Sequence, residues 1–374
     1  MNTGMGVLAC AGAGDHGTVR SDPFGQLPDG TPVSLFKLRG TNGVEADISN
    51  YGGVVTRLTA PDRSGHGANV VLGFESLADY VTKSPYFGAL IGRYANRIAN
   101  AEFTLGGQRF ALAKNHGANA LHGGVRGFDK VTWDVARAGP GPRGPELVLA
   151  YRSCDGEEGY PGTLSAMATY RVTGSNALEI DLAATTDRPT VVNLTHHSYF
   201  NLKSHGDVLG HVAEIDADSF TPVVDASLIP TGDLASVVGT AFDFRKPTPI
   251  GDRIDGPDRQ LYYANGYDHN WVINQTRGRL TRQASIHEPE TGRILEVWST
   301  EPGLQFYTGN FLDGSLAGRG GCRYAFRSGF TLEPQTFPDA PNQPTFPSAV
   351  LRPGQTYRHT IVYRFRTDRT SSPA

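Results

Sequence analysis

Cysteine, surplus charge and long apolar runs are all scarce in this sequence of 374 residues. The three cysteines, Cys10, Cys154 and Cys322, form no Cys-x-x-Cys pair and no metal-like cluster. We expect two or three free thiols, and the alternative is a disulfide between Cys154 and Cys322. The 34 basic and 37 acidic residues nearly balance, so no nucleic-acid partner is predicted. No apolar run reaches the roughly 18 residues of a membrane-spanning helix, so no membrane span is predicted.

The two ends of the sequence lack the pattern of a folded element. Residues 1–20 are rich in glycine and alanine, and we expect a disordered tail or the remnant of a signal there. Val7–Cys10 faintly resembles the end of an export signal but lacks a basic leader and an apolar run of about 7–15 residues. We therefore expect a cytoplasmic protein, or a periplasmic or secreted one if Met1–Gly17 is a clipped export signal. Residues 368–374 are expected to form a second tail.

Glycine and proline are abundant, with 46 and 24 residues, which is typical of many short strands joined by turns. Apolar and polar residues alternate in on the order of fifteen segments, with no βαβ rhythm and no fixed repeat. The clearest alternating segments are Val33–Leu38, Val44–Ile48, Val54–Leu58, Leu164–Val172, Leu178–Leu182, Ile294–Trp298 and Tyr357–Phe365. We predict an all-β fold, a large antiparallel β-sandwich that forms a single domain over residues 21–367.

Turn signals punctuate these segments. Gly106-Gly107 lies between two short alternating runs and predicts a hairpin over Phe103–Phe110. Pro140–Pro145 is predicted to be a surface loop between two strands, and Gly251–Gln260 a second loop. The one persuasive helical piece is Ser76–Tyr80, with Ser76 as its N-cap.

A run near the middle of the chain, Val191–Leu202, concentrates polar side chains in a pattern that predicts a strand running into a turn. Side chains alternate faces along a strand. One face should therefore carry Asn193, Thr195, His197 and Tyr199, and the other Leu194, His196, Ser198 and Phe200. Adjacent histidines on opposite faces disfavour a shared metal ion. We expect one of them to face a polar cleft and the other to be structural, although this run taken alone favours a hydrogen-bonded core histidine.

Two polar clusters elsewhere combine donors, acceptors and glycine. Asn96 and Arg97 follow the apolar run Phe87–Ile91 and offer amide and guanidinium groups that suit a polyol or a surface loop. His122 precedes two glycines, which permit close backbone approach or an ordinary turn.

Three further positions carry polar groups in apolar strands. Asp268 opens the strand that continues through Trp271, and a lone aspartate at such a place is more often a turn-former. Gln305 and Tyr307 share one strand face, which suits a sugar or a sheet interior. Glu333 follows two apolar residues of a hydrophobic strand, and ionised glutamates are rarely buried without a partner. It is therefore a candidate base, with a salt bridge at the end of a strand as the alternative.

Together these runs resemble the aldose 1-epimerase family, also called galactose mutarotases. Nine motifs resemble those of the family and occur in its order: Gly92–Ile98, Leu121–Gly124, Asp155–Pro161, Asn193–Leu202, Leu228–Gly232, Gly266–Asn270, Gln305–Asn310, Leu332–Gln335 and Phe346–Ser348. The resemblance extends from about Phe24 to Phe365. It implies a galactose mutarotase-like supersandwich that interconverts the α and β anomers of free hexoses such as galactose and glucose.

The family also implies roles for individual residues. Glu333 would be the general base, His197 the general acid, and His122 would lie beside the ring oxygen and the anomeric centre. The sugar-binding residues would be Asn96, Arg97, Asp268 and Gln305. Because only protons move in this reaction, no metal and no cofactor is expected. The expected partner is a small aldose, bound by a monomer or weak dimer. The departures from the family are His196, the Ile-Ala-Asn that follows Arg97, and the Pro140–Pro145 insert, and none of them touches the proposed acid or base.

Three other functions stay open on the sequence. A non-catalytic carbohydrate-binding module would need the sugar ligands but not Glu333 and His197 together. A glycoside hydrolase needs two carboxylates, for which Glu333 and Asp268 are the only pair that we nominate. An epimerase for hexose 6-phosphates needs extra lysine or arginine at the pocket, and beyond Arg97 the sequence offers no clear candidate.

Overall fold

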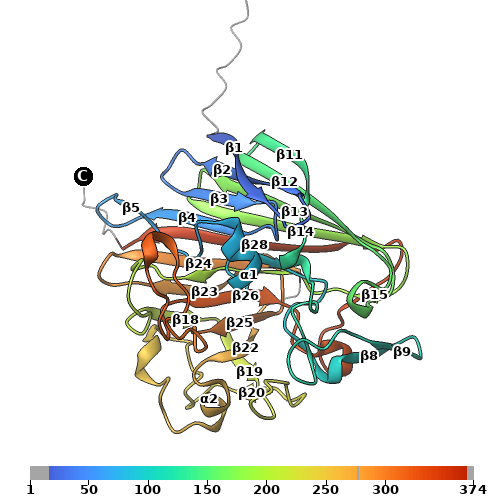
Figure 1. The fold of residues 1–374 in the computed structure, drawn as a ribbon. Helices are drawn as coiled ribbons and strands as arrows, with labels where there is room; N and C mark the ends of the chain where they lie inside the picture. Colours follow the sequence, from blue (N-terminus) through green and yellow to red (C-terminus); the bar gives the residue numbers. More distant parts are fainter. Residues whose placement is uncertain (1–16, 276–277, 369–374) are drawn as a thin grey trace, which may run out of the picture.

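The computed structural model of the chain describes residues 17–275 and 278–368 (Figure 1). The expected tails were residues 1–20 and 368–374, and their parts over residues 1–16 and 369–374, together with Cys10 and the signal-like motif, lie outside the described residues. Within them, the fold passes the predicted domain boundaries at both ends. Strand β1 begins at Thr18. Asp368 lies 2.8 Å from Arg63 Nη2 and 2.9 Å from His287 Nε2, so this residue is tied to the fold.

Antiparallel strands build three main sheets. The five-stranded sheet contains β1 (Thr18–Gln26), β2 (Pro32–Arg39), β3 (Glu45–Ser49), β4 (Val55–Pro61) and β5 (Gly67–Asn69), in that order. The nine-stranded sheet runs in the order β11 (Asp134–Gly141), β12 (Gly144–Ser153), β13 (Leu164–Thr173), β14 (Ala177–Thr186), β28 (Tyr357–Thr367), β24 (Arg293–Ser299), β23 (Thr281–His287), β18 (Val212–Ile215) and β21 (Thr248–Pro249). The six-stranded sheet runs in the order β17 (Tyr199–Phe200), β26 (Phe330–Gln335), β25 (Gly303–Tyr307), β22 (Asp268–Ile273), β19 (Ala217–Thr221) and β20 (Ala235–Ser236).

Short strand pairs and helical turns complete the described part. The pairs are β7 (Arg97–Ile98) with β10 (Ala120–Leu121), β8 (Glu102–Leu105) with β9 (Gln108–Ala111), β15 (Thr190–Val191) with β27 (Val350–Leu351), and β16 (Thr195–His197) with β6 (Ala89–Ile91). The α-helices are α1 (Leu77–Lys83) and α2 (Arg259–Ala264). Single 3₁₀ turns span residues 99–101, 128–130, 157–159, 250–252, 319–321 and 340–342. No helix in the described ranges is long and apolar enough to cross a membrane.

The five-stranded and six-stranded sheets cover the same face of the nine-stranded sheet. Tyr170 of β13 and Tyr363 of β28 point from that one face, as the register through β14 requires. Tyr170 donates a hydrogen bond to Gly53 O at 2.6 Å, in the connection before β4, whereas Tyr363 donates to Leu332 O of β26 at 3.3 Å. One continuous hydrophobic core fills the space between the layers. The structure is thus the large antiparallel sandwich that the sequence predicted.

Most local predictions are confirmed. The seven alternating segments overlap β2, β3, β4, β13, β14, β24 and β28, and β8 and β9 form the predicted hairpin. Ser76 caps α1 by accepting a hydrogen bond from Asp79 N at 3.2 Å. Cys154 and Cys322 are free and exposed, so they do not form a disulfide.

Two loop predictions are right only in part. The region around Pro140–Pro145 is a hairpin with a two-residue turn, because Pro140 pairs with Pro145 and Gly141 with Gly144. Strand β11 is at the edge of its sheet, where a missing N–H is tolerated. The predicted loop Gly251–Gln260 ends in α2, whose N-cap Asp258 accepts from Gln260 N at 2.8 Å. At six residues this helix is too short to show a periodic pattern.

The central run Val191–Leu202 is three short strands rather than one. β15 pairs with β27, β16 with β6, and β17 with β26, so each segment has a different partner. The side chain of Asn193 fills the gap between β15 and β16 by donating to Ala95 O at 3.1 Å and Thr336 O at 3.2 Å. The run therefore crosses between sheets, and it carries His197 to the edge of the six-stranded sheet.

Candidate active site

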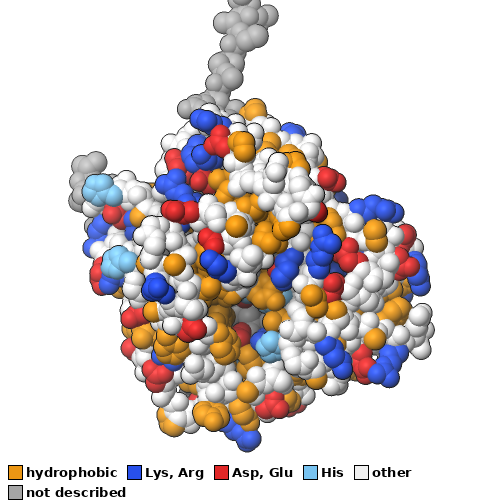
Figure 2. Space-filling view, viewed as in Figure 1, with side chains coloured by type: hydrophobic (Ala, Val, Ile, Leu, Met, Phe, Trp, Pro, Cys, Tyr) orange, Lys and Arg blue, Asp and Glu red, His pale blue; other side chains and the backbone are white. Residues whose placement is uncertain are grey.

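A cleft of about 300 Å³ opens on the six-stranded sheet, and Figure 2 shows a hollow in the middle of this face of the molecule. The seven residues predicted from the sequence all line this one cleft: Asn96, Arg97, His122, His197, Asp268, Gln305 and Glu333. They come from six separate parts of the chain. The floor is the sheet itself, and the loops around β7 and β10 form one wall.

The floor follows from strand register. Gln305 of β25 is directly opposite Glu333 of β26. Asp268 of β22 is opposite Tyr307, two residues beyond Gln305 on β25. Directly paired residues and residues two apart share a face of a sheet. The register of these strands thus brings four side chains to one surface of the sheet: those of Asp268, Gln305, Tyr307 and Glu333.

His197 and Glu333 form the closest pair of titratable groups in the cleft. His197 Nε2 lies 3.4 Å from Glu333 Oε1, which also accepts a hydrogen bond from Thr331 Oγ1 at 2.8 Å. Glu333 Oε2 is buried and has no protein partner. Burial raises the pKa of Glu333 from 4.5 to about 8, against the Thr331 hydrogen bond and with help from Asp268. Burial likewise lowers the pKa of His197 from 6.5 to about 4. The two shifts favour the uncharged forms of both groups.

His122 stands beside this pair in a fixed tautomer. Its Nδ1 accepts a hydrogen bond from Asn96 N at 3.1 Å, so in the neutral ring Nε2 carries the hydrogen. Its ring packs edge-on against His197, with centroids 5.1 Å apart, and against Tyr86 at 4.7 Å. Burial, and then the neighbouring His197 and Arg97, lower the pKa of His122 well below 6.5. His122 therefore presents a neutral N–H donor.

Arg97, Asp268 and Gln305 form a polar network along the floor. Gln305 Nε2 donates to Asp268 Oδ1 at 2.7 Å, and Arg97 Nη2 lies 3.8 Å from Asp268 Oδ2. Burial raises the pKa of Asp268, while the Arg97 guanidinium opposes this shift. Gln305 Oε1 and Arg97 Nε have no protein partner, although both are buried. Such groups in a cleft are ready to bind hydroxyl groups.

Three cleft residues adopt left-handed backbone conformations. The φ angles are 69° at Tyr86, 64° at Asn96 and 50° at His122. Asparagine and histidine are enriched at positive φ, whereas a bulky tyrosine there is rare. Such strain clusters at functional sites, where the surrounding structure holds it in place.

Aromatic residues of the wall were not among the predicted site residues. Tyr86, Tyr199, Tyr307 and Phe311 line the cleft. Tyr199 and Tyr307 could have been found, because both share a predicted strand face with a site residue. Tyr86 and Phe311 lie outside the strands, so the alternation gives no signal for them.

The two adjacent histidines point to opposite sides, as alternation predicted. His197 lines the cleft, whereas His196 is fully buried between Tyr170 and Tyr363, with ring centroids 6.2 Å and 5.7 Å away. His196 thus belongs to the core between the layers.

A metal ion would have three candidate ligands here. One ligand atom each of His122, His197 and Glu333 lies within 4.8 Å of the others. However, the lone pair of His122 Nδ1 already accepts the Asn96 N–H, and neutral His122 carries a hydrogen on Nε2. A metal ligand needs a free lone pair. The donor set therefore fits proton transfer better than metal coordination.

Comparisons with known proteins bear on this cleft. A family model described as aldose 1-epimerase matches residues 34–364. Galactose mutarotase of Sus scrofa is 46% identical over 351 residues, which covers 93% of this chain and 98% of that protein. Aldose 1-epimerase of Escherichia coli K12 is 38% identical over 341 residues and covers 90% and 96% of the two chains.

Solved structures agree with these relatives. The crystal structure of galactose 1-epimerase from Lactobacillus acidophilus superimposes with a TM-score of 0.83 at 27% identity, over 94% of this chain and 99% of that one. An aldose epimerase homologue from C. elegans gives a TM-score of 0.82 at 30% identity, over 90% of this chain and 99% of its own. The similarity thus includes every strand that lines the cleft.

Proposed function

This chain belongs to the aldose 1-epimerase family, and we propose that its cleft interconverts the α and β anomers of a free aldose, galactose and glucose first. The observation that carries the proposal is the buried pair in the cleft, with His197 Nε2 only 3.4 Å from Glu333 Oε1. One base and one acid next to each other are what opening a hemiacetal ring requires.

Proton transfer in this reaction is balanced. Glu333, as the carboxylate, takes the proton of the C1 hydroxyl, while His197, as the imidazolium, gives a proton to the ring oxygen. The bond between C1 and the ring oxygen breaks, and an open-chain aldehyde remains. Rotation about C1–C2 exposes the other face of the carbonyl group. Closure returns the proton from Glu333 to the C1 oxygen, and His197 recovers its proton from the C5 hydroxyl.

The pKa shifts of Glu333 and His197 fit the state of the reaction in which the sugar ring is open. After ring opening Glu333 is protonated and His197 is neutral. These are the forms that burial favours, since the pKa of Glu333 is raised to about 8 and that of His197 is lowered to about 4. The empty cleft thus already holds the proton distribution that accompanies the open-chain sugar. Substrate hydroxyls that stabilise the ionised pair would start the cycle.

The remaining predicted residues hold the ring. Asp268 accepts and Arg97 donates hydrogen bonds to neighbouring hydroxyls, and Gln305 offers its free Oε1. The Nε2–H of His122 donates toward the ring oxygen and the anomeric centre. Tyr199 and Tyr307 add aromatic surface for the C–H face of the sugar. Holding the ring places acid and base on the same bond, which is a large part of catalysis.

The alternatives are less well supported. Arg97 is the one lysine or arginine among the described residues that line the cleft, and it lies beside Asp268, so a sugar phosphate would lack a dedicated cation. A glycoside hydrolase leaves the adjoining histidines without a task. A binding module has no use for an unpaired buried carboxylate, which destabilises the fold in its ionised form.

Polarimetry tests the proposal directly. Purified protein is added to freshly dissolved α-D-galactose, α-D-glucose and glucose 6-phosphate, and the approach to the equilibrium rotation is compared with the spontaneous rate. We expect acceleration that is proportional to enzyme for the free sugars and is much weaker for the phosphate. Binding of galactose without acceleration would favour a binding module. Release of the aglycone from a chromogenic glycoside would favour a hydrolase.

A further inference from the structure

The motif Asp155–Pro161 contributes nothing to the cleft lining, yet its segment contacts both loops of the cleft wall. The guanidinium of Arg93, three residues before Asn96, is buried inside this segment. It donates to the carbonyl oxygens of Cys154, Pro161 and Gly162 at 2.9, 3.0 and 2.7 Å. The segment therefore holds the base of the loop that carries Asn96 and Arg97.

The same segment reaches the second loop through Glu158. Its Oε2 accepts a hydrogen bond from Val125 N at 2.8 Å, and its Oε1 accepts one from Arg126 N at 3.0 Å. A Cβ atom on Gly124 would lie 2.2 Å from Glu158 Oε2, so only glycine leaves room for the carboxylate. Hydrogen bonds to an ionised acceptor are about twice as strong as neutral ones. Glu158 thus clamps the turn that directly follows His122.

This turn has little other support on its outer side. Val125 is 60% exposed and Arg126 is exposed as well, so neither packs into a core. On the inner side, Asn115 Nδ2 donates to Leu121 O and Gly124 O, both at 2.8 Å. Between these two anchors His122 keeps its positive φ of 50°. A strained backbone of this kind persists only where its surroundings fix it.

We propose that Glu158 is a positioning residue for the ring opening: by holding the backbone N–H groups of Val125 and Arg126, it fixes the direction of His122 Nε2–H. The inference rests on the proposed function insofar as His122 contacts the sugar ring. Glu158 itself touches no substrate, because it is outside the cleft lining. Its own backbone is also strained, with φ at 52°. A side chain that is held in place although its own backbone is strained fits a role in positioning.

Two substitutions test the clamp in kinetics. Glu158→Gln keeps the size but offers one acceptor where two N–H groups point. Glu158→Asn favours the positive φ and is too short to reach both groups. We expect kcat to fall about tenfold or more in both, as misplacement of a reacting group by about 1 Å can cost 10²-fold. The KM should change less than about threefold, because the contacts of Arg97, Asp268 and Gln305 are untouched.

Glu290→Gln is the matched control. Glu290 makes a surface ion pair with Lys203 at 2.5 Å and lies outside the cleft lining, so kcat should stay at the wild-type value. A loss of kcat in this control equal to that in the Glu158 variants would overturn the inference. So would wild-type kcat in both Glu158 variants.

A readout on His122 itself separates positioning from a general loss of structure. In sugar-free wild-type protein, ¹⁵N spectra should show His122 with its hydrogen on Nε2, and Glu158→Asn should shift the signals of both ring nitrogens, because the released turn moves Nδ1 relative to Asn96 N. In a His122→Ala background, Glu158→Asn should cost less than twofold in kcat, because coupled residues are not additive. Unchanged His122 signals, or the full loss in that background, would overturn the inference. The spectra decide this even if the wild type fails to interconvert anomers, which would instead reject the proposed function.

Discussion

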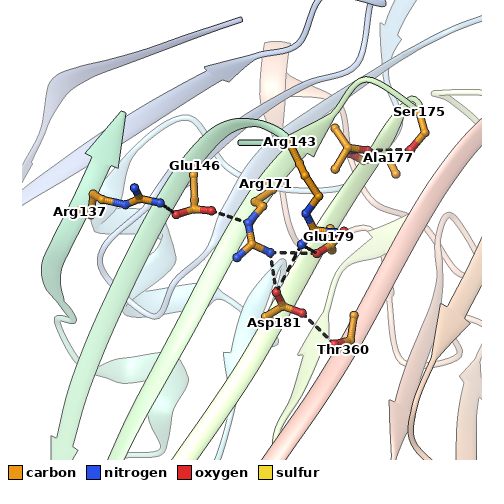
Figure 3. A network of polar contacts seen from close by, with 10 residues as sticks. Arg137, Arg143, Glu146, Arg171, Ser175, Ala177, Glu179, Asp181 and Thr360 are labelled. Atoms are coloured by element: carbon orange, nitrogen blue, oxygen red, sulfur yellow. Dashed lines mark hydrogen bonds and ion pairs between the residues drawn. The ribbon is translucent and has the colours of Figure 1, made fainter. Parts of the chain in front are cut away.

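Two polar faces of this molecule treat buried carboxylates in opposite ways. On the outer face of the nine-stranded sheet, Figure 3 shows the buried Glu146 and Glu179 and the partly exposed Asp181 beside arginines, which come from neighbouring strands and from the turn between β11 and β12. Arg171 lies between them, in contact with Glu146 and with its Nη1 2.9 Å from Glu179 Oε1. Thr360 of β28 extends this ion-pair ladder by donating to Asp181 at 2.7 Å.

On the cleft face, the most buried carboxylate has no cation beside it. Glu333 is 2% exposed, its nearest titratable neighbour is His197, and its Oε2 has no partner. Arg97, the one arginine among the described residues that line the cleft, lies beside Asp268 instead. The charged groups of the ladder thus pair with each other, whereas Glu333 Oε2, Gln305 Oε1 and Arg97 Nε in the cleft have no protein partner. Buried polar groups without partners lower the stability of a fold, so the cleft is organised for a polar ligand rather than for stability.

Replacing Glu333 with glutamine should have the largest effect on activity. Glutamine keeps the shape but cannot accept a proton, so kcat for galactose should fall at least about 10²-fold, the low end for general base catalysis. The KM should stay within a few-fold. Polarimetric initial rates over a range of sugar concentrations give both constants. Near-normal turnover would require another base, and Asp268 would be the next candidate.

The same variant should not be less stable. The pKa of Glu333 is raised in the fold from 4.5 to about 8. Between these values the unfolded chain gives up the proton first, so the free energy of unfolding should fall as pH rises. Glutamine lacks this dependence. The melting temperature of Glu333→Gln relative to wild type should therefore rise from pH 5 to pH 8, and a relative decrease would contradict the assignment of the buried unpaired carboxylate.

On the ladder, Arg171→Met should lower the stability and leave the activity unchanged, which is the opposite of the result expected for Glu333→Gln. It removes the cation between Glu146 and Glu179, whose side chains are 4% and 9% exposed. Breaking a buried pair from one side costs roughly 3–5 kcal/mol of unfolding free energy. Urea unfolding measures this loss, and kcat should be unchanged. The matched control is Arg137→Met on the exposed end, with a loss of about 0–1 kcal/mol. A drop in kcat for Arg171→Met would show that the two faces are coupled.

The pH dependence should report on the cleft face alone. The reaction needs one proton on the pair of His197 and Glu333. With the pKa of His197 lowered to about 4, a second proton arrives below that pH and removes the base. With the pKa of Glu333 raised to about 8, the single proton leaves above that pH and removes the acid. The rate should therefore fall about tenfold per pH unit outside this window. Arg171→Met should keep this profile. In His197→Asn the base acts without its partner, so the remaining rate should fall below about pH 8, where Glu333 takes up a proton.

Sequence reasoning succeeded where one local rule decides the outcome. Alternation along strands placed His197 and His196 on opposite sides, and it placed Gln305 and Tyr307 on one strand face, which the structure shows to line the cleft. The resemblance to a family then identified which polar positions belong to one site. No spacing could have shown that His197 lies next to Glu333, because that contact depends on how β16 and β26 meet.

The failures have physical reasons as well. The run Val191–Leu202 was predicted to be one strand, but alternation does not reveal that the pairing partner changes twice. Tyr86 was missed because its place in the cleft depends on a left-handed backbone conformation. That conformation is rare for tyrosine, so the sequence does not predict it. The role of the Glu158 carboxylate could not be predicted either, because it binds backbone N–H groups, which no residue pattern marks.

Asp268→Asn should have a smaller effect than the changes above, and mainly on binding. Asparagine can still accept the hydrogen bond of Gln305, but it leaves Arg97 without its anionic neighbour. We expect the KM for galactose to rise about tenfold, near 1.4 kcal/mol, with kcat within a few-fold. Asp181→Asn on the ladder is the control and should leave both constants unchanged. A loss confined to kcat would place Asp268 in proton transfer instead.

Chelation should have the smallest effect of all. His122, His197 and Glu333 are close enough to hold an ion. However, His122 Nδ1 accepts the Asn96 N–H and its Nε2 carries the hydrogen, so a metal would have to break that bond or displace that proton. The neighbouring Glu333 is held mainly protonated, since burial raises its pKa to about 8, and that too weakens it as a ligand at neutral pH. Dialysis against EDTA should therefore leave kcat unchanged in polarimetry and metal analysis should find no stoichiometric ion. Loss of activity that zinc or another divalent ion restores would mean that a cation neutralises the carboxylate of the cleft, as the arginines do on the ladder. The difference between the two faces would then not hold.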